Sequence, residues 1–458
     1  MVAAVLPDAN DPGLLQVAET SLLVDLYELT MAASYLREDM DQDSVFELFV
    51  RRLPPRRDWL LTAGLGPALR LAVGMRFGEA ELGYLRARGF DDAFLDRLAG
   101  LRFSGDVEAM PEGTICFANE PIVRVTGPRI EAQLLETLLL NQVNFQTMAA
   151  TKAARIALAA GGGEPGAGER VIDFSPRRDH GIDAAMKVAR SAAIAGCGGT
   201  SNVAAAMRYG LRPVGTMAHS FVLSFASEIA SFEAFLRSFP ERGTLLVDTF
   251  DVEAGVRNAI EASRSTEVPL RGVRIDSGDL GALARRARRL LDEAGMPETE
   301  ITVSGNLEEG RIAELVAGGA PIDRFGVGTD LGTSRDSPTV DGVYKLVADA
   351  LDDGWRGVRK LSADKATLPG PKQVWRRHRD GSMAGDLVAA AEESADGEPL
   401  LAPFVRGGEI VREEDLGTMR DRAAAGLRSL PVGLRPASGE AAKEPYPVEI
   451  SAALTATG

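Results

Sequence analysis

Short apolar runs recur through the middle of the chain, and a longer stretch with helical spacing follows each of them. Repeated strand–helix units of this kind predict parallel strands joined by right-handed crossovers. We therefore expect an α/β fold, either an α/β barrel or a doubly wound sheet. The runs that predict its strands are 170–174, 212–218, 244–250, 271–278, 300–306 and 322–329.

Polar residues follow these runs and should gather at the C-terminal edge of the sheet, where sites form in both architectures. One such ending usually caps a helix, but five on successive strands indicate a shared crevice. The side chains concerned are Asp173, Arg177, Arg178, His180, His219, Ser220, Asp248, Asp251, Arg274, Asp276, Ser277 and Asp279.

The residue types in this set predict the binding of an anion. Gly305, Gly326 and Gly328 permit tight turns whose N–H groups can surround a phosphate. Arg177 and Arg274 offer bidentate contacts to phosphate oxygens.

Two acidic residues, Asp248 and Asp276, could hold Mg²⁺ or orient ribose hydroxyls. The set contains neither an acid–base dyad nor a nucleophile–base pair. We therefore expect a site that stabilises charge on a phosphorylated sugar.

The two ends of the chain predict a second kind of structure. Residues 21–37 have helical spacing behind Ser21 as a candidate N-cap, and 44–126 indicate an α+β unit. Antiparallel strands are expected after about 341, followed by a helix over 412–427. The predicted parts are a disordered arm (1–20), an N-terminal helix and α+β domain (21–126), a catalytic α/β domain (127–348), a C-terminal segment packing on the α+β domain (349–435) and a flexible tail (436–458).

Composition narrows the class of protein. A chain of 458 residues suggests two or three domains, and a net charge of −15 argues against nucleic-acid or anionic-membrane partners. The two cysteines lie far apart, no basic leader begins the chain, and no apolar run is long enough to span a membrane. We expect a cytoplasmic protein.

Several other signals carry little weight. The run 161–166 formally matches GxGxxG, but it follows a helical stretch and contains Pro165, and the chain has no P-loop motif. The basic stretch 284–295 reads as an amphipathic helix, and His378 as a strand-surface residue. His180 fits either a surface loop or a substrate pocket.

A set of motifs, in order, resembles the nicotinate phosphoribosyltransferase family over about residues 21–350. The motifs are DLYELTMAASY (25–35), FELFVRRLP (46–54), DFSPRRDHGIDAAMKVARSAAIAGCGGTSNV (173–203), GTMAHS (215–220), RIDSGDL (274–280) and DRFGVGTDLGTSRDSP (323–338).

The resemblance implies an irregular α/β barrel of the type II phosphoribosyltransferases, with an α+β N-terminal domain completed by C-terminal strands. It also implies a homodimer with shared active sites. Its reaction would join nicotinate to 5-phosphoribosyl 1-pyrophosphate, with ATP hydrolysis and Mg²⁺, in NAD salvage.

The resemblance also assigns roles to residues. His219 matches the histidine that ATP phosphorylates, Phe174 should stack on the nicotinate ring, and Tyr27 should cover the ring from the second subunit. Arg274, Asp248 and Asp276 are the other expected catalytic residues, the two aspartates as tentative Mg²⁺ ligands. The remaining expected substrate contacts are Arg177, Arg178, His180, Thr200, Ser201, Asn202, Ser277, Gly305, Gly328, Thr329 and Arg335.

Two positions bear on specificity. Nicotinamide enzymes resemble this chain but have an aspartate where Ser201 stands, and an aspartate would repel the carboxylate of nicotinate. The family commonly has glycine after the DF pair, whereas this chain has Ser175 and Pro176. That departure leaves open whether Arg177 or Arg178 contacts substrate.

The sequence is also compatible with other functions. A nicotinamide or quinolinate phosphoribosyltransferase would share much of the pattern. A barrel aldolase or sugar-phosphate isomerase would need a Schiff-base lysine or a carboxylate base, and Lys345 is the obvious lysine. A non-catalytic nucleotide sensor on a degenerate barrel is the third alternative.

Overall fold

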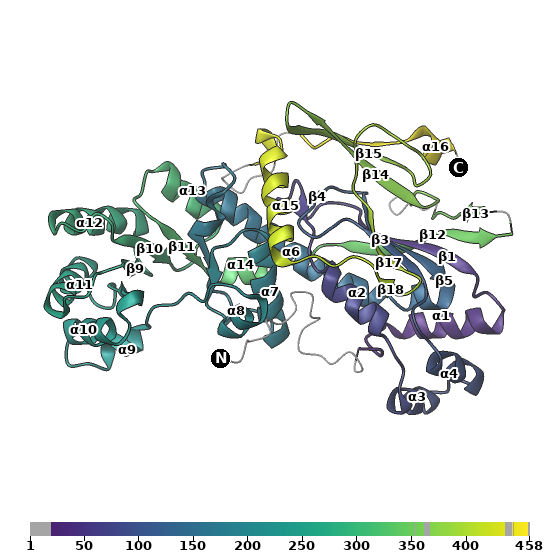
Figure 1. Ribbon diagram of the computed structural model, residues 1–458, viewed down its shortest axis with the longest axis horizontal. Coiled ribbons are helices and arrows are strands. Elements are labelled where there is room, and N and C mark those ends of the chain that lie inside the picture. Colours follow the sequence, from purple (N-terminus) through teal and green to yellow (C-terminus); the bar gives the residue numbers. More distant parts are fainter. Residues whose placement is uncertain (1–19, 353, 361–366, 436–441, 443, 457–458) are drawn as a thin grey trace. The chain divides into compact units, whose positions relative to one another are not determined.

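The chain folds into two compact units in the computed structural model, which describes residues 20–352, 354–360, 367–435, 442 and 444–456 (Figure 1). Unit 1 comprises Met1–Thr151, Asp336–Leu434 and Ala441–Gly458, and unit 2 comprises Lys152–Arg335 and Arg435–Glu440. Residues 127–151 and 336–348 therefore lie in unit 1, not with the parallel strands as the sequence predicted. The predicted arm 1–20 lies outside the described residues except for Thr20.

Unit 1 contains a seven-stranded antiparallel sheet in the order β13-β12-β1-β5-β3-β17-β18. Its strands are β1 (Asp43–Val50), β3 (Asp106–Ala109), β5 (Pro121–Pro128), β12 (Gly342–Leu351), β13 (Gly354–Gly357), β17 (Ala402–Arg406) and β18 (Glu409–Ile410). Phe46 of β1 stands opposite Leu346 on one side and Val125 on the other. The sheet thus joins segments from both ends of the chain, and all of β1 after its first residue is buried.

Two smaller sheets complete unit 1, and one of them corrects a prediction. The order is β16-β14-β15-β19 in the first, while β2 pairs with β4 in the second. The tail was expected to be flexible over 436–458, but β19 pairs with β15, and α16 follows it. Tyr446 anchors this segment: it is buried, stacks on Phe117 and donates to Asp386 Oδ1 at 2.8 Å. The strands are β2 (Leu60–Leu61), β4 (Ile115–Cys116), β14 (Lys372–Arg379), β15 (Ser382–Ala390), β16 (Glu398–Pro399) and β19 (Val448–Ile450).

Aspartates cap three helices of unit 1, and the first helix begins later than predicted. The first helix starts after Asp25, not after Ser21, because Asp25 is extended and Glu28 follows at the position that completes a capping box. Asp415 caps α15 by accepting from Thr418 N. The helices are α1 (Leu26–Arg37), α2 (Leu65–Gly74), α3 (Glu79–Arg86), α4 (Asp92–Ala99), α5 (Arg129–Gln133), α15 (Leu416–Ser429) and α16 (Ala452–Ala456), and α6 (Glu136–Ala160) ends in unit 2.

Unit 2 is built on an open parallel sheet in the order β7-β6-β11-β10-β9-β8. Five of the six predicted runs form its strands. The run 212–218 does not: it makes a single bridge, in which Thr200 N donates to the Arg212 carbonyl oxygen and Val214 N donates to the Thr200 carbonyl oxygen. The N–H that Pro213 lacks would lie on the side away from Thr200, so proline prevents a regular ladder there. The strands are β6 (Val171–Asp173), β7 (Gly199–Thr200), β8 (Thr244–Leu246), β9 (Gly272–Ile275), β10 (Glu300–Ser304) and β11 (Arg324–Val327).

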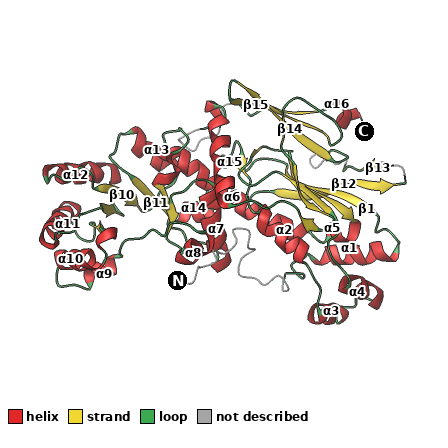
Figure 2. Ribbon diagram, viewed as in Figure 1, coloured by secondary structure: helices red, strands yellow, loops and turns green. Residues whose placement is uncertain are grey.

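A helix follows each of these strands, with α8, α9 and α10 in succession between β7 and β8, while unit 1 holds the longer strands (Figure 2). Side-chain caps start several of the helices. Asp251 and Asp279, two members of the predicted crevice, are N-caps that accept from Ala254 N and Ala282 N. The helices are α7 (Ile182–Ile194), α8 (Val203–Tyr209), α9 (His219–Leu223), α10 (Glu228–Ser238), α11 (Val252–Thr266), α12 (Leu280–Glu293), α13 (Glu309–Ala317) and α14 (Thr329–Thr333).

Candidate active site

The segments after β8 and β9 meet at the C-terminal edge of the parallel sheet. Asp276 N and Ser277 Oγ both donate to Asp248 Oδ2, at 2.9 and 2.8 Å. The other oxygen of this carboxylate, Asp248 Oδ1, is buried and has no hydrogen-bond partner among the described residues. It lies 4.0 Å from Nε2 of His219. The predicted pair of aspartates is therefore brought together, beside the predicted histidine.

His219 is the first residue of α9, and both of its ring nitrogens face polar groups. Nδ1 lies 3.1 Å from Thr249 Oγ1, while Nε2 faces Asp248. The side chain is still 44% exposed, so another molecule can reach the ring. Thr249 was not predicted as a site residue, although it directly follows Asp248 in the sequence.

Arg274 extends from β9 with much of its donor capacity unused. Its Nη1 donates to Thr216 Oγ1 at 2.8 Å, while its Nε is buried without a hydrogen-bond partner in the described structure. Burial lowers the pKa of Arg274, and Asp276 and Asp248 act in the opposite direction. A half-buried guanidinium with a spare N–H suits an anionic group of a substrate.

A glycine turn after β10 lies directly against Asp276. Gly305 has φ +92°, and a Cβ at this position would overlap the carbonyl oxygen of Asp276. Ser304, the residue before it, donates from its hydroxyl to Asp276 Oδ1. The turn therefore holds Asp276 from two sides, and only glycine fits at 305.

Phe174 presents an aromatic ring beside the sheet. The ring packs across Gly326 of β11 so closely that a Cβ there would come within 2.5 Å of two ring carbons. Phe174 and Thr216 also line a cavity of about 600 Å³, together with residues of β6, β8, β10 and β11. The cavity extends from Phe174 and Thr216 to Thr244, Glu300 and Arg324, the first residues of β8, β10 and β11, so only its end near Phe174 adjoins the C-terminal edge of the sheet.

The turn after β7 is held by two of its own predicted substrate contacts. Thr200 donates its hydroxyl to Asp173 Oδ2 at 2.7 Å, and Asn202 caps α8 by accepting from Ala205 N at 3.1 Å. Ser201 lies between them, and its N–H donates to the Asp173 carbonyl oxygen. Thr200 and Asn202 support the turn, while the hydroxyl of Ser201 is not used by it.

The other predicted contacts lie at the ends of unit 2 elements or in unit 1. Arg177, Arg178 and His180 are exposed in the loop after β6, so that His180 has the surface-loop position. Gly328 and Thr329 begin α14, and Arg335 pairs with Asp330 at 3.1 Å.

Tyr27 lies on α1 of unit 1 and is 45% exposed. It lines a cavity of about 400 Å³ with Glu136, and burial and the charge of Glu136 raise the pKa of Tyr27.

Lys345, His378 and possible metal ligands were also considered in the sequence, and the structure places each of them. Lys345 lies on β12 of unit 1, paired with Glu136, and not at an end of a parallel strand, which removes the candidate for a Schiff base. His378 is exposed on β14, as predicted. In the described residues, no group of three or more His, Cys, Asp or Glu side chains is arranged to hold a metal ion.

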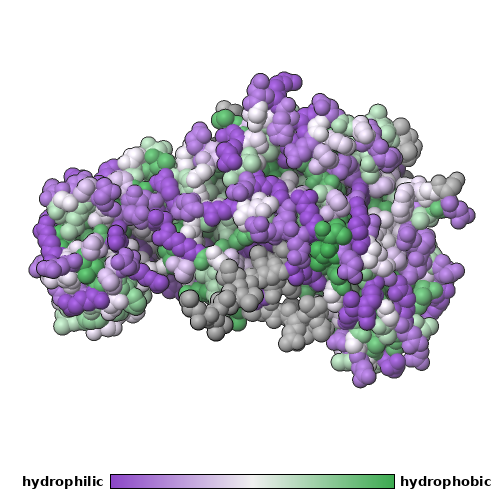
Figure 3. Space-filling view, viewed as in Figure 1, coloured by the Kyte–Doolittle hydropathy of each residue, from purple (hydrophilic) through white to green (hydrophobic). Residues whose placement is uncertain are grey.

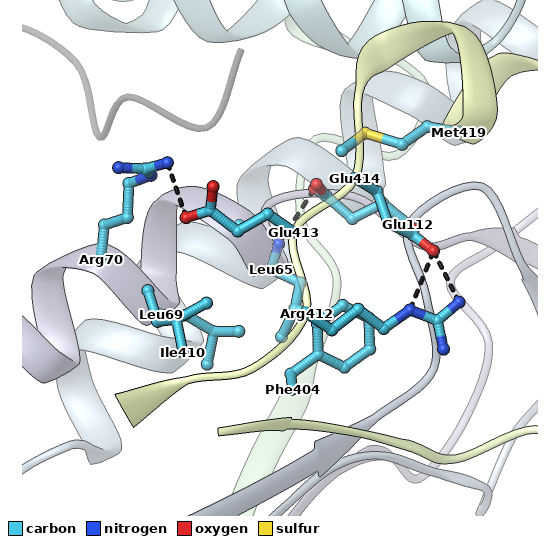
Figure 4. Close-up of a pocket in the computed structure, with 11 residues that line it drawn as sticks. Leu65, Leu69, Arg70, Glu112, Phe404, Ile410, Arg412, Glu413, Glu414 and Met419 are labelled. Carbon is cyan, nitrogen blue, oxygen red and sulfur yellow. Dashed lines mark hydrogen bonds and ion pairs between the residues drawn. The ribbon is translucent and has the colours of Figure 1, made fainter. Parts of the chain in front are cut away.

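A third pocket, also in unit 1, is too small to bind a substrate (Figure 4). It measures about 20 Å³, roughly enough for one water molecule. The salt bridges Arg70–Glu413 and Arg412–Glu414 are among its walls.

The surface in view is mostly hydrophilic, with hydrophobic side chains in small groups (Figure 3). Through the described part of the chain, every helix is too short or too polar to cross a membrane.

Comparison with known proteins gives a consistent result. Residues 22–144 match the model of the nicotinate phosphoribosyltransferase (NAPRTase) N-terminal domain, and residues 170–367 match that of the nicotinate phosphoribosyltransferase (NAPRTase) family. The chain is 47% identical over 436 residues to nicotinate phosphoribosyltransferase pncB2 of Mycobacterium tuberculosis, covering 94% of this chain and 91% of that protein. It is 39% identical to nicotinate phosphoribosyltransferase of Bacillus subtilis, covering 84% and 79%.

Among solved structures, the fold is similar to that of human nicotinic acid phosphoribosyltransferase. The TM-score is 0.81 at 28% identity, covering 95% of this chain and 99% of the human one. A nicotinate-nucleotide pyrophosphorylase from Pyrococcus furiosus is similar with a TM-score of 0.71 at 26% identity, covering 90% and 96%.

Proposed function

The chain belongs to the nicotinate phosphoribosyltransferase family, and on that premise we propose that it is the enzyme of that name. It forms nicotinate mononucleotide and pyrophosphate from nicotinate and 5-phosphoribosyl 1-pyrophosphate, a step of NAD salvage. The observation that carries the proposal is the cluster at one edge of the parallel sheet, where Nε2 of His219 lies 4.0 Å from Asp248 Oδ1 and the charges of Asp276 and Asp248 act on Arg274.

The fold and assembly extend this proposal. The open six-stranded sheet of unit 2 corresponds to the irregular α/β barrel of the type II phosphoribosyltransferases, and the α+β domain is unit 1. The enzyme acts as a homodimer in which Tyr27 of one subunit covers the nicotinate bound by the other. The exposed position of Tyr27 on α1 supports this role.

Binding of the pyridine ring falls to Phe174 and the cavity beside it. The ring nitrogen of nicotinate is unprotonated near neutral pH, so its attack on the anomeric carbon needs no general base. Rate enhancement then comes from alignment of the two substrates and from preorganised charge around the ribosyl group. Ser201 carries no negative charge, so it does not repel the carboxylate of nicotinate as an aspartate at this position would.

The arginines and the aspartates bind the charged groups of the sugar substrate, the aspartates through Mg²⁺. Arg274 and one of Arg177 and Arg178 stabilise the leaving pyrophosphate, while Gly305, Gly328 and Thr329 form the turns for the 5′-phosphate. Asp248 and Asp276 would hold Mg²⁺, and the buried, unpartnered Asp248 Oδ1 fits this role. Two carboxylates suffice because Mg²⁺ usually completes its shell with water and substrate phosphates. When bound, the ion neutralises charge on the pyrophosphate.

ATP acts through His219. An imidazole nitrogen attacks the γ-phosphorus, the bond from that phosphorus to the ADP oxygen breaks, and ADP leaves as a P–N bond forms. The imidazole proton passes to solvent. Phosphorylation places new negative charge beside the substrate site, and water later removes the phosphoryl group as inorganic phosphate. The modification changes affinity and equilibrium, and His219 does not act as the nucleophile toward ribose.

The test is product formation from nicotinate, nicotinamide or quinolinate, with 5-phosphoribosyl 1-pyrophosphate and Mg²⁺, with and without ATP, followed by mass spectrometry. We expect nicotinate mononucleotide as the main product and ATP to raise its yield. His219→Asn should abolish the effect of ATP, while His378→Asn, which changes an exposed histidine of unit 1, should keep it. Preferred turnover of another base, or ATP stimulation in His219→Asn, would contradict the proposal.

A further inference from the structure

The loop after β6 is held by a hydroxyl that stands between two carboxyl groups. Ser175 Oγ lies 2.6 Å from Asp173 Oδ1 and 3.0 Å from Asp179 Oδ2. A hydroxyl carries one proton, so Ser175 can donate to only one of the two carboxyl groups. For the second contact to be a hydrogen bond, one of the two carboxyl groups must be protonated and donate to Ser175 Oγ.

The two carboxyl groups differ in what else they accept. Asp173 also accepts from Ser175 N at 2.9 Å and from Thr200 Oγ1 at 2.7 Å. With the Ser175 hydroxyl this makes three donors, which suits an ionised carboxylate. Asp179, in contrast, has a buried Oδ1 without a hydrogen-bond partner in the described structure. The extra proton therefore belongs on Asp179.

We propose that Asp179 is a positioning residue that acts in its protonated form, donating to Ser175 Oγ and thereby fixing the loop that carries Arg177 and Arg178. The inference deepens the proposed function and rests on it, because the position of these arginines matters only if they bind substrate phosphate. Nothing in the reaction itself requires Asp179 to touch substrate.

Backbone contacts show how the carboxyl group of Asp179 can fix the arginines. The N–H groups of Arg178 and Asp179 both donate to the Ser175 carbonyl oxygen, at 2.6 and 3.2 Å. The turn therefore closes around Ser175, and Arg177 lies inside it. A bond from Asp179 to the Ser175 hydroxyl closes the same turn through side chains.

Helix α14 packs directly on this junction. A Cβ at Gly332 would overlap Asp179 Oδ1 and would lie 2.7 Å from Ser175 Cβ. Because α14 begins at Thr329, just after Gly328, the arginine loop and the proposed phosphate turn rest against each other. Asp179 thus sets the position of the loop that carries Arg177 and Arg178 relative to the turn at Gly328.

The charges around Asp179 make its proton sensitive to pH. Burial and then the charge of Asp173 raise the pKa of Asp179 to about 6, while the hydrogen bond with Ser175 and, to a smaller extent, His180 act in the opposite direction. The folded-state pKa lies above the unfolded one, so the bond to Ser175 is complete in acid and is lost as the pH rises through about 6. The charged groups of the neighbouring helices are in ion pairs: Asp183 with Lys187 on α7, and Asp330 of α14 with Arg335, which follows that helix.

The experiment is hydrogen–deuterium exchange of residues 175–181 in the full chain, below and above pH 6, in wild type and two variants. Asp179→Asn keeps a neutral donor, and Asp179→Ala removes it. Below pH 6 we expect wild type and Asp179→Asn to be equally protected, and Asp179→Ala to exchange roughly fivefold faster. Above pH 6, wild type should lose protection toward the level of Asp179→Ala, while Asp179→Asn keeps it.

Two results would overturn the proposal: a wild type that follows Asp179→Asn on both sides of pH 6, or an Asp179→Asn that exchanges like Asp179→Ala. These readouts do not depend on activity, so they stand apart from a failure of the proposed function. In turnover measured below pH 6, where Asp179 keeps its proton, Asp179→Ala should raise the KM for 5-phosphoribosyl 1-pyrophosphate roughly fivefold with little change in kcat. Lost protection with an unchanged KM would overturn the link from the loop to substrate binding.

Discussion

Replacing Gly305 by alanine tests whether the turn after β10 positions Asp276. Alanine at φ +92° costs about 1–2 kcal/mol in backbone conformation. The new Cβ would also overlap the Asp276 carbonyl oxygen and lie 3.1 Å from its carbonyl carbon, and relieving such overpacking costs a further ~1–3 kcal/mol. We therefore expect Gly305→Ala to destabilise unit 2 by about 2–5 kcal/mol in total.

The matched control is Gly295→Ala. Gly295 also has positive φ, +79°, but a Cβ there meets nothing within 4 Å, so this variant measures the backbone cost alone. Thermal unfolding should separate the two, since each kcal/mol shifts the Tm of a unit of this size by about 2–4 °C.

Activity gives the second comparison. A displacement of Asp276 by about 1 Å should lower kcat/KM about 100-fold in Gly305→Ala, while Gly295→Ala keeps wild-type turnover. Equal Tm values and equal turnover in the two variants would refute the argument that Gly305 is needed for its close approach to Asp276.

Three further predictions test other parts of the chain. Ser201→Asp should raise the KM for nicotinate about tenfold or more by charge repulsion and admit nicotinamide; unchanged base preference would contradict the role of Ser201. Arg274→Lys should lower kcat/KM about 100-fold, because lysine cannot replace the spare Nε–H donor; steady-state kinetics with Arg285→Lys as a control would show it, and a loss no larger than in that control would refute it. Burial raises the pKa of Glu28 to about 7, so unit 1 of wild type should lose stability as the pH rises from about 4.5 to about 7. Glu28→Gln should remove this loss, up to about 3 kcal/mol, in Tm measurements across that range; the same slope in both proteins would exclude Glu28 as its source.

The parallel strands were predictable because their apolar runs are buried and regularly followed by helices. β7 was not, since Gly199–Thr200 is too short and too glycine-rich to read as an apolar run. The strand predicted at 212–218 was wrong because this run makes only one bridge, to Thr200, and Pro213 has no N–H for a ladder on its other side. The prediction of a flexible tail was wrong for its described residues because it rested on composition. Composition does not show that Tyr446 is buried, since that burial depends on residues distant in the sequence.

The site was predictable to the extent that its chemistry follows the ends of strands. Asp248 and Asp276 were found this way, but so were Asp251 and Asp279, which cap helices. Residue type alone does not separate the two roles, although a cap directly precedes its helix.

Thr249 was missed for a different reason. Hydroxyl residues are common, and its role depends on which way one side chain points toward a neighbouring loop. Three other hydroxyl side chains were missed for the same reason, those of Thr216, Ser304 and Ser175.

The pairing of β1 with β12 has a consequence for synthesis on the ribosome. About 300 residues separate these neighbours, so β1 waits roughly 15–60 s for its partner at ordinary translation rates. Residues Lys152–Arg335, nearly all of unit 2, emerge in that interval and can fold first. Until then β1 offers an apolar, unpaired edge to other nascent chains, and slow elongation between Lys152 and Arg335 should increase aggregation more than slow elongation after Leu351.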